Sequence, residues 1–266
     1  MIGFCPLASG SKGNCFFLGT DSCKILIDLG IGKNTVLSRL SELSIHPEDI
    51  QAILVTHEHT DHTAGIKSFA KTFGTPVIAN LETAKSLCRS LEFHPQFKIF
   101  STGDTFSFQD LIIRSFSVCH DAADPVGFVF SYQGERLGFC TDAGFVTSLL
   151  ITDLMDCEYL VIEANHEPDM VLRSSRPSIY KNRVLSKLGH LSNDECGKLL
   201  MQITSPRLKG LYLAHLSAET NTEQLAFDKI SHYLSDISSV TPKIAYQDKL
   251  SEPLFFEKST KLISSL

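Results

Sequence analysis

Short apolar runs and amphipathic stretches alternate through the first hundred residues of the chain. A continuous run such as residues 52–55 is typical of a buried strand. Apolar residues three and four positions apart, as in 66–73, predict one buried face of a helix. The predicted strands here are 3–8, 15–18, 25–28, 52–55, 77–78 and 97–100, and the predicted helices are 33–43, 66–73 and 82–91.

The middle of the chain is richer in strands, and the last third returns to alternation. Predicted strands are 111–118, 126–132, 136–141, 159–162, 208–214, 242–246 and 253–256, and predicted helices are 145–155, 193–203 with Ser192 as its cap, and 222–234. No internal repeat or low-complexity segment interrupts this order. We therefore expect an α/β protein that forms a single domain over residues 1–266.

One polar motif follows strand 52–55 directly: Thr56-His57-Glu58-His59-Thr60-Asp61-His62-Thr63. In extended backbone, residues two apart point to the same side, so His57 and His59 are expected to converge. We expect Thr60 to cap a helix, which puts Asp61 and His62 in its first turn. Imidazole and carboxylate are ligands of zinc, manganese and iron. The alternative is an exposed polar turn rich in histidine.

Further histidine and aspartate residues stand where later strands end. His120 follows strand 111–118, Asp142 follows 136–141, and His215 follows 208–214. Each alone is typical of a turn, but as a set they indicate a site built at one side of a sheet. Asp28 ends strand 25–28, where it either caps a turn or orients a ligand histidine from behind.

Composition limits the partners and the compartment. The chain has 266 residues, a net charge of −6 and 43% hydrophobic residues, which is ordinary for a globular protein and argues against a general nucleic-acid coat protein. The start lacks a basic segment followed by an apolar core, and no apolar run approaches the roughly 20 residues of a membrane span. The 8 cysteines include no Cys-x-x-Cys pair. We expect a cytoplasmic protein with reduced thiols and no membrane contact.

Two basic features have two readings each. The stretch Ser9-Gly10-Ser11-Lys12-Gly13-Asn14 is either a plain hairpin turn or an anion site formed by free amides and Lys12. Segment 170–190 contains five basic residues and no acid. It is either a solvated helical face or a strip that contacts phosphates. The five basic residues are Arg173, Arg176, Lys181, Arg183 and Lys187.

The polar residues that follow the predicted strands, taken together, resemble the metallo-β-lactamase superfamily. The resemblance covers nearly the whole chain. It implies a four-layer αββα sandwich with two mixed β-sheets and a site along one edge. It also implies two divalent metal ions, Zn²⁺ or Mn²⁺ with iron as a further candidate. The implied ligands are His57, His59 and His120 for the first ion, Asp61, His62 and His215 for the second, and Asp142 as the bridge, with Asp28 supporting them from behind.

Several shorter motifs are similar to those of the YycJ/WalJ group within that superfamily. They are Leu7-Ala8-Ser9-Gly10-Ser11-Lys12-Gly13-Asn14, His120-Asp121-Ala122-Ala123-Asp124-Pro125-Val126-Gly127, Glu163-Ala164-Asn165-His166, Gly189-His190-Leu191-Ser192-Asn193 and Ala214-His215-Leu216-Ser217. The group implies a phosphodiesterase described as a 5′-to-3′ exonuclease on DNA, with DNA a better candidate substrate than RNA. The interval from Asp142 to His215 is too short for the extra clamp domain of RNase J-type nucleases.

We hypothesise hydrolysis by a hydroxide that two metal ions generate at neutral pH. Asp61 is a candidate to orient or deprotonate the water, and the proton donor to the leaving oxygen is either His190 or the Glu163/His166 pair. Each also has a purely structural reading. The candidate phosphate- or substrate-binding residues are Ser11, Lys12, Asn14, Arg183, Ser192 and Ser217.

Two other functions compete with a nuclease. The same ligand set serves thioester and lactam hydrolases, which attack a carbonyl and need no basic strip. A non-catalytic metal-binding regulator is the second rival, and it predicts a broken ligand set. The ligand set in this sequence is unbroken.

Overall fold

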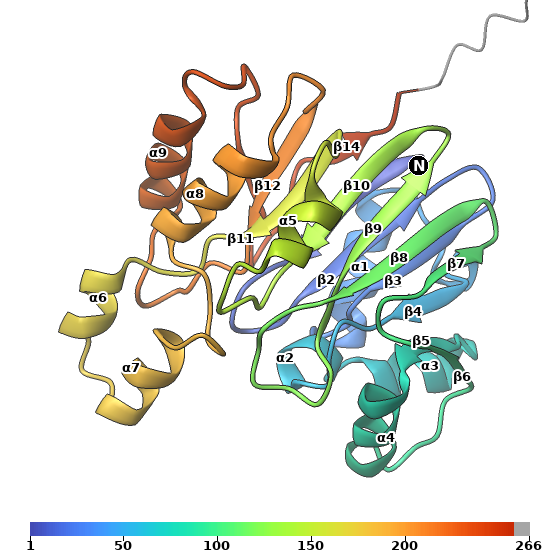
Figure 1. Ribbon diagram of the computed structural model, residues 1–266. Coiled ribbons are helices and arrows are strands. Elements are labelled where there is room, and N and C mark those ends of the chain that lie inside the picture. Colours follow the sequence, from blue (N-terminus) through green and yellow to red (C-terminus); the bar gives the residue numbers. More distant parts are fainter. Residues whose placement is uncertain (258–266) are drawn as a thin grey trace, which may run out of the picture.

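The computed structural model describes residues 1–257, which build two seven-stranded mixed sheets (Figure 1). The expected single domain therefore extends beyond the described residues at 258–266. In the first sheet, β3 to β6 form one end of the sheet and pair in parallel, and the remaining neighbours are antiparallel. Its order is β14 (Leu254–Phe255), β1 (Gly3–Ala8), β2 (Cys15–Gly19), β3 (Lys24–Ile27), β4 (Ala52–Leu54), β5 (Val77–Asn80) and β6 (Phe97–Phe100).

The second sheet has the same plan, and its parallel strands come from the C-terminal half of the chain. Strands β10 to β13 pair in parallel, and β7 to β10 are antiparallel. Its order is β13 (Lys243–Ile244), β12 (Gly210–Ala214), β11 (Tyr159–Glu163), β10 (Glu135–Cys140), β9 (Val126–Tyr132), β8 (Leu111–Ser117) and β7 (Thr105–Phe108).

Buried apolar side chains form three layers of contact, which separate four layers of structure. Between the sheets, aromatic rings interdigitate: Phe16 of β2 meets Phe139 of β10 edge to face at a centroid distance of 4.9 Å. The outer face of the first sheet is covered by α1 (Lys33–Glu42), α3 (Ile66–Phe73) and α4 (Leu81–Ser90). The outer face of the second is covered by α5 (Ser148–Leu154), α8 (Asn193–Ile203) and α9 (Glu223–Leu234). The predicted αββα sandwich is confirmed.

Four short helical segments lie in the connections rather than in the layers. Helix α2 (Thr60–Thr63) follows β4, and a 3₁₀ turn, η1 (Pro47–Asp49), precedes it. Helices α6 (Pro168–Arg173) and α7 (Ser178–Val184) stand off one side of the sandwich (Figure 1). They occupy the basic segment and lie between β11 and α8, in an interval from Asp142 to His215 that holds four helices and two strands.

Local predictions fail in three places. Thr60 is the first residue of α2, and the capping position is His59, so the expected Thr60 cap is wrong. The helix predicted over 145–155 begins only at Ser148, because the side chain of Thr147 accepts from the amide of Leu150 and caps it. Strand β7 was not predicted, since an edge strand that exposes alternate residues carries little apolar signal. Among residues 1–257, no helix is both long and apolar enough to cross a membrane.

Candidate metal centre and active site

Three histidine nitrogens meet where the two sheets face each other at one edge. His57 and His59 come from the loop after β4, and His120 comes from the loop after β8. Nε2 of His57 and Nε2 of His120 lie 3.1 and 3.3 Å from Nδ1 of His59. Two nitrogens bound to one tetrahedral zinc at 2.0–2.1 Å lie about 3.3 Å apart. The spacing of this trio therefore fits ligands of one ion.

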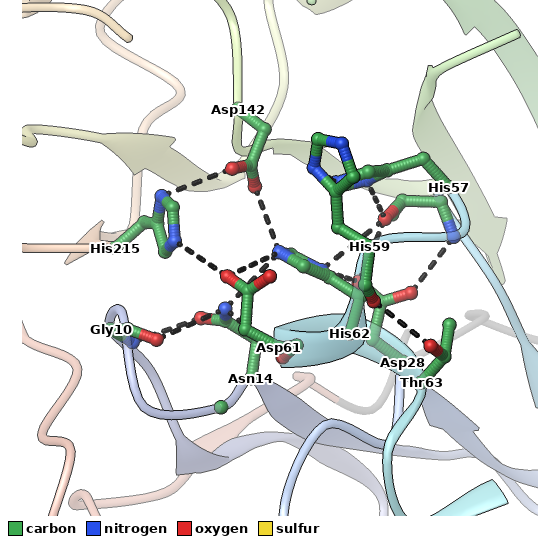
Figure 2. A network of polar contacts seen from close by, with 12 residues as sticks. Gly10, Asn14, Asp28, His57, His59, Asp61, His62, Thr63, Asp142 and His215 are labelled. Atoms are coloured by element: carbon green, nitrogen blue, oxygen red, sulfur yellow. Dashed lines mark hydrogen bonds and ion pairs between the residues drawn. The ribbon is translucent and has the colours of Figure 1, made fainter. Parts of the chain in front are cut away.

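A second cluster of Asp61, His62 and His215 lies beside the first, and Asp142 contacts its His62 and His215 (Figure 2). Asp61 Oδ2 lies 3.5 Å from Nε2 of both His62 and His215. Asp142 reaches into both clusters: Oδ2 is 3.2 Å from His62 Nε2, and Oδ1 is 3.8 Å from His120 Nε2. The seven residues named as candidate ligands are thus brought together, with Asp142 between the two groups.

Three of the residues that follow strands have left-handed backbone. Asp28 after β3, Asp142 after β10 and His215 after β12 have φ of 55°, 56° and 55°. Side chains other than glycine rarely adopt this region, and residues held there cluster at functional sites. The reversal at the strand end turns each side chain across the edge of its sheet and toward the cluster.

Each of the five histidines among the candidate ligands points one ring nitrogen at the cluster, and its other ring nitrogen contacts another group of the protein. His62 Nδ1 lies 2.8 Å from Asp28 Oδ2, and His215 Nδ1 lies 2.8 Å from Glu163 Oε1. The remaining partners are Thr56 Oγ1 for His57, the Asp121 carbonyl for His59 and the Gly189 carbonyl for His120. Such outer partners fix the ring orientation and the tautomer of a metal ligand. The Asp28 that we expected behind a ligand histidine lies there.

Two buried polar atoms at the centre make no hydrogen bond within residues 1–257. They are Oδ2 of Asp142 and Nε2 of His215, and both residues are 2% exposed. An unpaired buried polar atom costs about 1–3 kcal/mol, so such atoms call for a partner. A divalent ion held by these residues would supply one, and the donor set of imidazole and carboxylate suits such an ion.

The charges in the cluster depend on one another. Burial opposes a charge on His215, but the nearby Asp142 and the hydrogen bond to Glu163 outweigh it and raise its pKa to about 10. Burial likewise opposes a charge on His62, and Asp142 and Asp28 raise its pKa well above the usual value. For Asp142 burial favours the neutral acid, but His215 and His62 hold its pKa well below the usual range. The cluster therefore concentrates negative charge that a cation can neutralise.

Glu163, at the end of β11, ties the cluster to a further histidine. Its Oε1 lies 2.8 Å from Nδ1 of both His215 and His190, and its Oε2 accepts from the amides of Ala143 and Leu191. The carboxylate is fully buried. Burial raises its pKa, but His190 and the two hydrogen bonds outweigh this and lower it to about 2. Glu163 is thus an ionised acceptor at neutral pH and has no proton to donate.

The expected pairing of Glu163 with His166 is not formed, because both oxygens of Glu163 accept from other groups. His166 lines a different cavity, described below. His190 instead lies at the metal cluster, with Nδ1 held by Glu163 and the side chain 19% exposed. Of the candidate donors, His190 alone lines the cavity over the metal cluster.

An open cavity of about 440 Å³ lies over the cluster. His59, Asp61, His120, Asp142, His190 and His215 form its floor and wall. Ser11, Lys12, Tyr180 and Arg183 also line it. Two cationic side chains, Lys12 and Arg183, are therefore part of the cavity lining.

Comparisons with known proteins identify the family. The model of the "Metallo-beta-lactamase superfamily" matches residues 8–183. The chain belongs to the metallo-β-lactamase superfamily. Exodeoxyribonuclease YycJ of Bacillus anthracis is 37% identical over 237 residues, which cover 88% of this chain and 89% of that protein. Exodeoxyribonuclease WalJ of Streptococcus pneumoniae serotype 2 (strain D39 / NCTC 7466) is 37% identical over 224 residues, 83% of each chain. The chain is a YycJ/WalJ-like member of the superfamily.

Solved structures agree on the fold. Zn²⁺-bound PqqB from Methylobacterium extorquens superposes with a TM-score of 0.74 at 15% identity and covers 96% of this chain and 100% of its own. At that identity the likeness concerns the fold alone. Membership of the metallo-β-lactamase superfamily, together with the histidine and aspartate clusters, supports binding of divalent metal at this edge.

Three of the expected substrate-binding residues face inward. Asn14 is fully buried and bonds Ser9, the backbone of Gly10 and His62. Ser192 caps α8 in a capping box with Glu195. Ser217 Oγ accepts from the amides of Glu219 and Thr220 and closes a turn. None of the three lines the cavity over the metal cluster, so their expected contact with substrate stays a prediction.

The loop after β1 is a turn rather than an open anion site. Within residues 10–14, four amides donate inside the protein: those of Gly10, Lys12, Gly13 and Asn14. Gln247, which is distant in sequence, fixes the loop through two hydrogen bonds: its Oε1 accepts from the amide of Lys12, and its Nε2 donates to the carbonyl of Gly13. The side chains of Ser11 and Lys12, and not the amides, therefore face the cavity.

The basic segment also departs from the expected open strip. Arg176 pairs with Glu219, Lys181 donates to the carbonyl of Leu172, and Arg183 pairs with Asp121 through two hydrogen bonds. Three of the five cations thus have partners inside the protein. Of these three cations, Arg183 alone lines the cavity over the metal cluster, and its side chain is 55% exposed.

A buried asparagine network was not foreseen from the sequence. Asn221 Nδ2 donates to the carbonyls of Ala164 and Asn165 and to Asn193 Oδ1, and Asn165 Nδ2 donates to the His215 carbonyl. The network joins the end of β11, which carries Glu163, to the loops that carry His190 and His215. The recurrence of Asn in the motifs Glu163–His166 and Gly189–Asn193 was the available signal.

Proposed function

We propose that this protein is a metal-dependent phosphodiesterase that removes nucleotides from DNA in the 5′-to-3′ direction. Two divalent ions, Zn²⁺ or Mn²⁺, would be held by His57, His59 and His120 on one side and by Asp61, His62 and His215 on the other, with Asp142 between them. The 37% identity to proteins named exodeoxyribonucleases over most of both chains supports this activity.

When bound, two ions of this kind supply a hydroxide nucleophile near neutral pH and neutralise charge on the phosphoryl oxygens. The chain's own residues do the rest. Asp61 lines the cavity with its side chain 31% exposed, and it orients the attacking water. Lys12 and Arg183, which line the cavity, attract the phosphates of the substrate strand.

His190 donates the proton that the leaving oxygen needs. Its Nδ1 is held by Glu163 at 2.8 Å, so Nε2 is the nitrogen that faces substrate. The fully buried Glu163 carboxylate fixes the orientation of the His190 ring through this contact. The observation that carries the proposal is that one oxygen of Glu163 holds both His190 and the candidate metal ligand His215, which fixes a proton donor beside the metal cluster.

A carbonyl hydrolase is the competing activity, because the same ligand set can serve it. Attack on a neutral carbonyl requires no cation in the substrate path. Lys12 and Arg183, which both line the cavity, therefore favour a polyanion. We also propose a cytoplasmic location and a single domain, which eight unpaired cysteines and one continuous core between the sheets support.

The test is the purified protein with end-labelled single- and double-stranded DNA and RNA under Zn²⁺ and under Mn²⁺, with metal content measured in parallel. Progressive release of 5′-terminal deoxynucleotides is the expected result. Metal-loaded protein without activity on any of these substrates, but active on a thioester or a β-lactam, would replace the nuclease with a carbonyl hydrolase.

A further inference from the structure

A second cavity of about 460 Å³ adjoins the active site, with His190 lining both. We call it the His166 cavity. Its walls include Phe145 from the loop after β10, His166 from the loop after β11, Leu185 and Lys187 after α7, and Ser192 at the start of α8. Its volume lies within the about 300–1,000 Å³ typical of small-molecule pockets. Because His190 is the shared wall, a group bound here is a neighbour of the reacting phosphate.

Most charged groups around the His166 cavity already have partners. Lys198 pairs with Asp194 at 2.6 Å, and Glu195 accepts from the amide and hydroxyl of Ser192 in the capping box. Lys187 lies over the ring of Phe145 at 4.6 Å. A cavity whose charges are mostly paired, and which includes two carboxylates, suits a neutral occupant better than a phosphate.

Two side chains point to the kind of neutral occupant. Phe145 is 42% exposed, so part of a large aromatic ring remains uncovered at the cavity. His166 is 1% exposed, and its Nδ1 has no hydrogen-bond partner within residues 1–257. Burial lowers the pKa of His166, so the ring is neutral and can both donate and accept. A flat group with a polar edge matches both features.

We propose that the His166 cavity binds the base of the 5′-terminal nucleotide, the one that the reaction releases. This rests on the proposed function. Water attacks phosphorus, a new P–O bond forms, the bond from phosphorus to the 3′ oxygen of the terminal nucleotide breaks, and that oxygen takes a proton from His190. The leaving nucleotide must therefore lie against His190, and the His166 cavity is the space on that wall outside the metal cluster.

The decisive experiment compares two substrates and three proteins. The substrates are one 5′-phosphorylated DNA with a normal 5′-terminal nucleotide and one with an abasic 5′-terminal nucleotide. The proteins are the wild type, Phe145→Ala, and the matched control Phe255→Ala. Phe255 is 62% exposed and lies on β14 of the other sheet, away from both cavities. Because Phe145 is exposed, its replacement leaves the core intact.

Loss of a base stacked on an aromatic side chain costs about 5- to 100-fold in affinity. We expect the wild type and Phe255→Ala to release the abasic nucleotide about 5- to 100-fold less efficiently in kcat/KM, and Phe145→Ala to treat the two substrates alike. If the wild type does not distinguish the substrates, or if Phe145→Ala still does, the base does not bind in this cavity and the proposal is overturned.

A binding measurement separates this inference from the nuclease itself. Thymidine and deoxyadenosine are titrated into the metal-loaded wild type, Phe145→Ala and Phe255→Ala, and binding is followed by saturation-transfer NMR. We expect binding that Phe145→Ala weakens at least about 5-fold and Phe255→Ala leaves unchanged. Nucleoside binding of this kind in a protein without nuclease activity would retain the cavity and reject the proposed reaction. Absence of Phe145-dependent binding would reject the cavity.

Discussion

His190 Nδ1 lies 2.8 Å from Oε1 of Glu163, and that carboxylate has no exposed surface. The same oxygen lies 2.8 Å from Nδ1 of His215. Glu163 thus orients both His215, one of the seven candidate ligands, and His190, which is not one of the seven. This arrangement explains why a strand end at Glu163 and a loop at His190, distant in sequence, serve one site.

Replacing Glu163 with glutamine tests this link. Glu163 accepts through both oxygens, whereas Gln accepts only through its one oxygen, so either the two histidines or the two backbone amides lose their acceptor. We expect Glu163→Gln to lower both metal affinity and kcat about 10- to 100-fold. Metal content by mass spectrometry and kcat at saturating metal check it. A variant with normal values for both would mean that the carboxylate has no orienting role.

Asp28→Asn addresses the support of His62 in the same way. Asp28 accepts from the amide and hydroxyl of Thr56 and holds His62 Nδ1 at 2.8 Å. We expect metal affinity to fall about 10- to 100-fold, with the weaker-bound ion lost first during dialysis. The exposed Asp236→Asn is the control and should bind metal as the wild type does. Equal affinity in both variants would contradict the role of Asp28.

Metal binding should release protons from the cluster. Without metal, the pKa of His215 is raised to about 10 and that of His62 lies well above its usual value, so both rings are protonated at pH 7. A metal ligand must be the neutral imidazole. Affinity therefore rises with pH throughout the range below about 10. Calorimetry in buffers of different ionisation enthalpy should detect the released protons; binding that is independent of buffer and pH would contradict this account.

Asn221→Ala should destabilise the loops that carry the site. It removes the donor to the buried carbonyl of Ala164 and to Oδ1 of Asn193, and one of the two donors to the carbonyl of Asn165. We expect a loss of about 1–3 kcal/mol in the free energy of unfolding. Chemical denaturation measures it, with the exposed Asn34→Ala on α1 as the control. A loss no larger than in the control would mean that the network adds no stability.

Lys12→Ala should weaken DNA binding without affecting the metal cluster. Lys12 lines the cavity, and the loop that bears it is held through backbone atoms, which the substitution leaves in place. Loss of one phosphate contact should reduce the slope of log affinity against log salt by about 1. Lys71→Ala, exposed on α3, is the matched control. An unchanged slope for Lys12→Ala would place the DNA elsewhere.

The α/β class and the strand ends that carry the candidate ligands follow from strong local signals, whereas the αββα sandwich was implied by the resemblance to the metallo-β-lactamase superfamily. Apolar runs mark buried strands, and ligands such as Asp142 and His215 follow their ends directly. The sequence does not reveal side-chain direction or distant partners. Asn14 and Ser192 turn inward to close a loop and cap a helix. Arg183 pairs with Asp121, which no pattern in the segment 170–190 reveals. The edge strand β7 lacks an apolar run that would mark it.

The central claim is that His190 protonates the leaving 3′ oxygen during metal-dependent cleavage of DNA. The most direct test uses a DNA whose terminal linkage carries sulfur in place of that oxygen, since a thiolate leaves without a proton. On ordinary DNA, His190→Ala should retain its metal and lose about 10²- to 10⁴-fold in kcat, while the exposed His94→Ala should not. On the sulfur linkage the wild type and His190→Ala should differ by less than about 10-fold. An equal loss on both linkages would contradict the account.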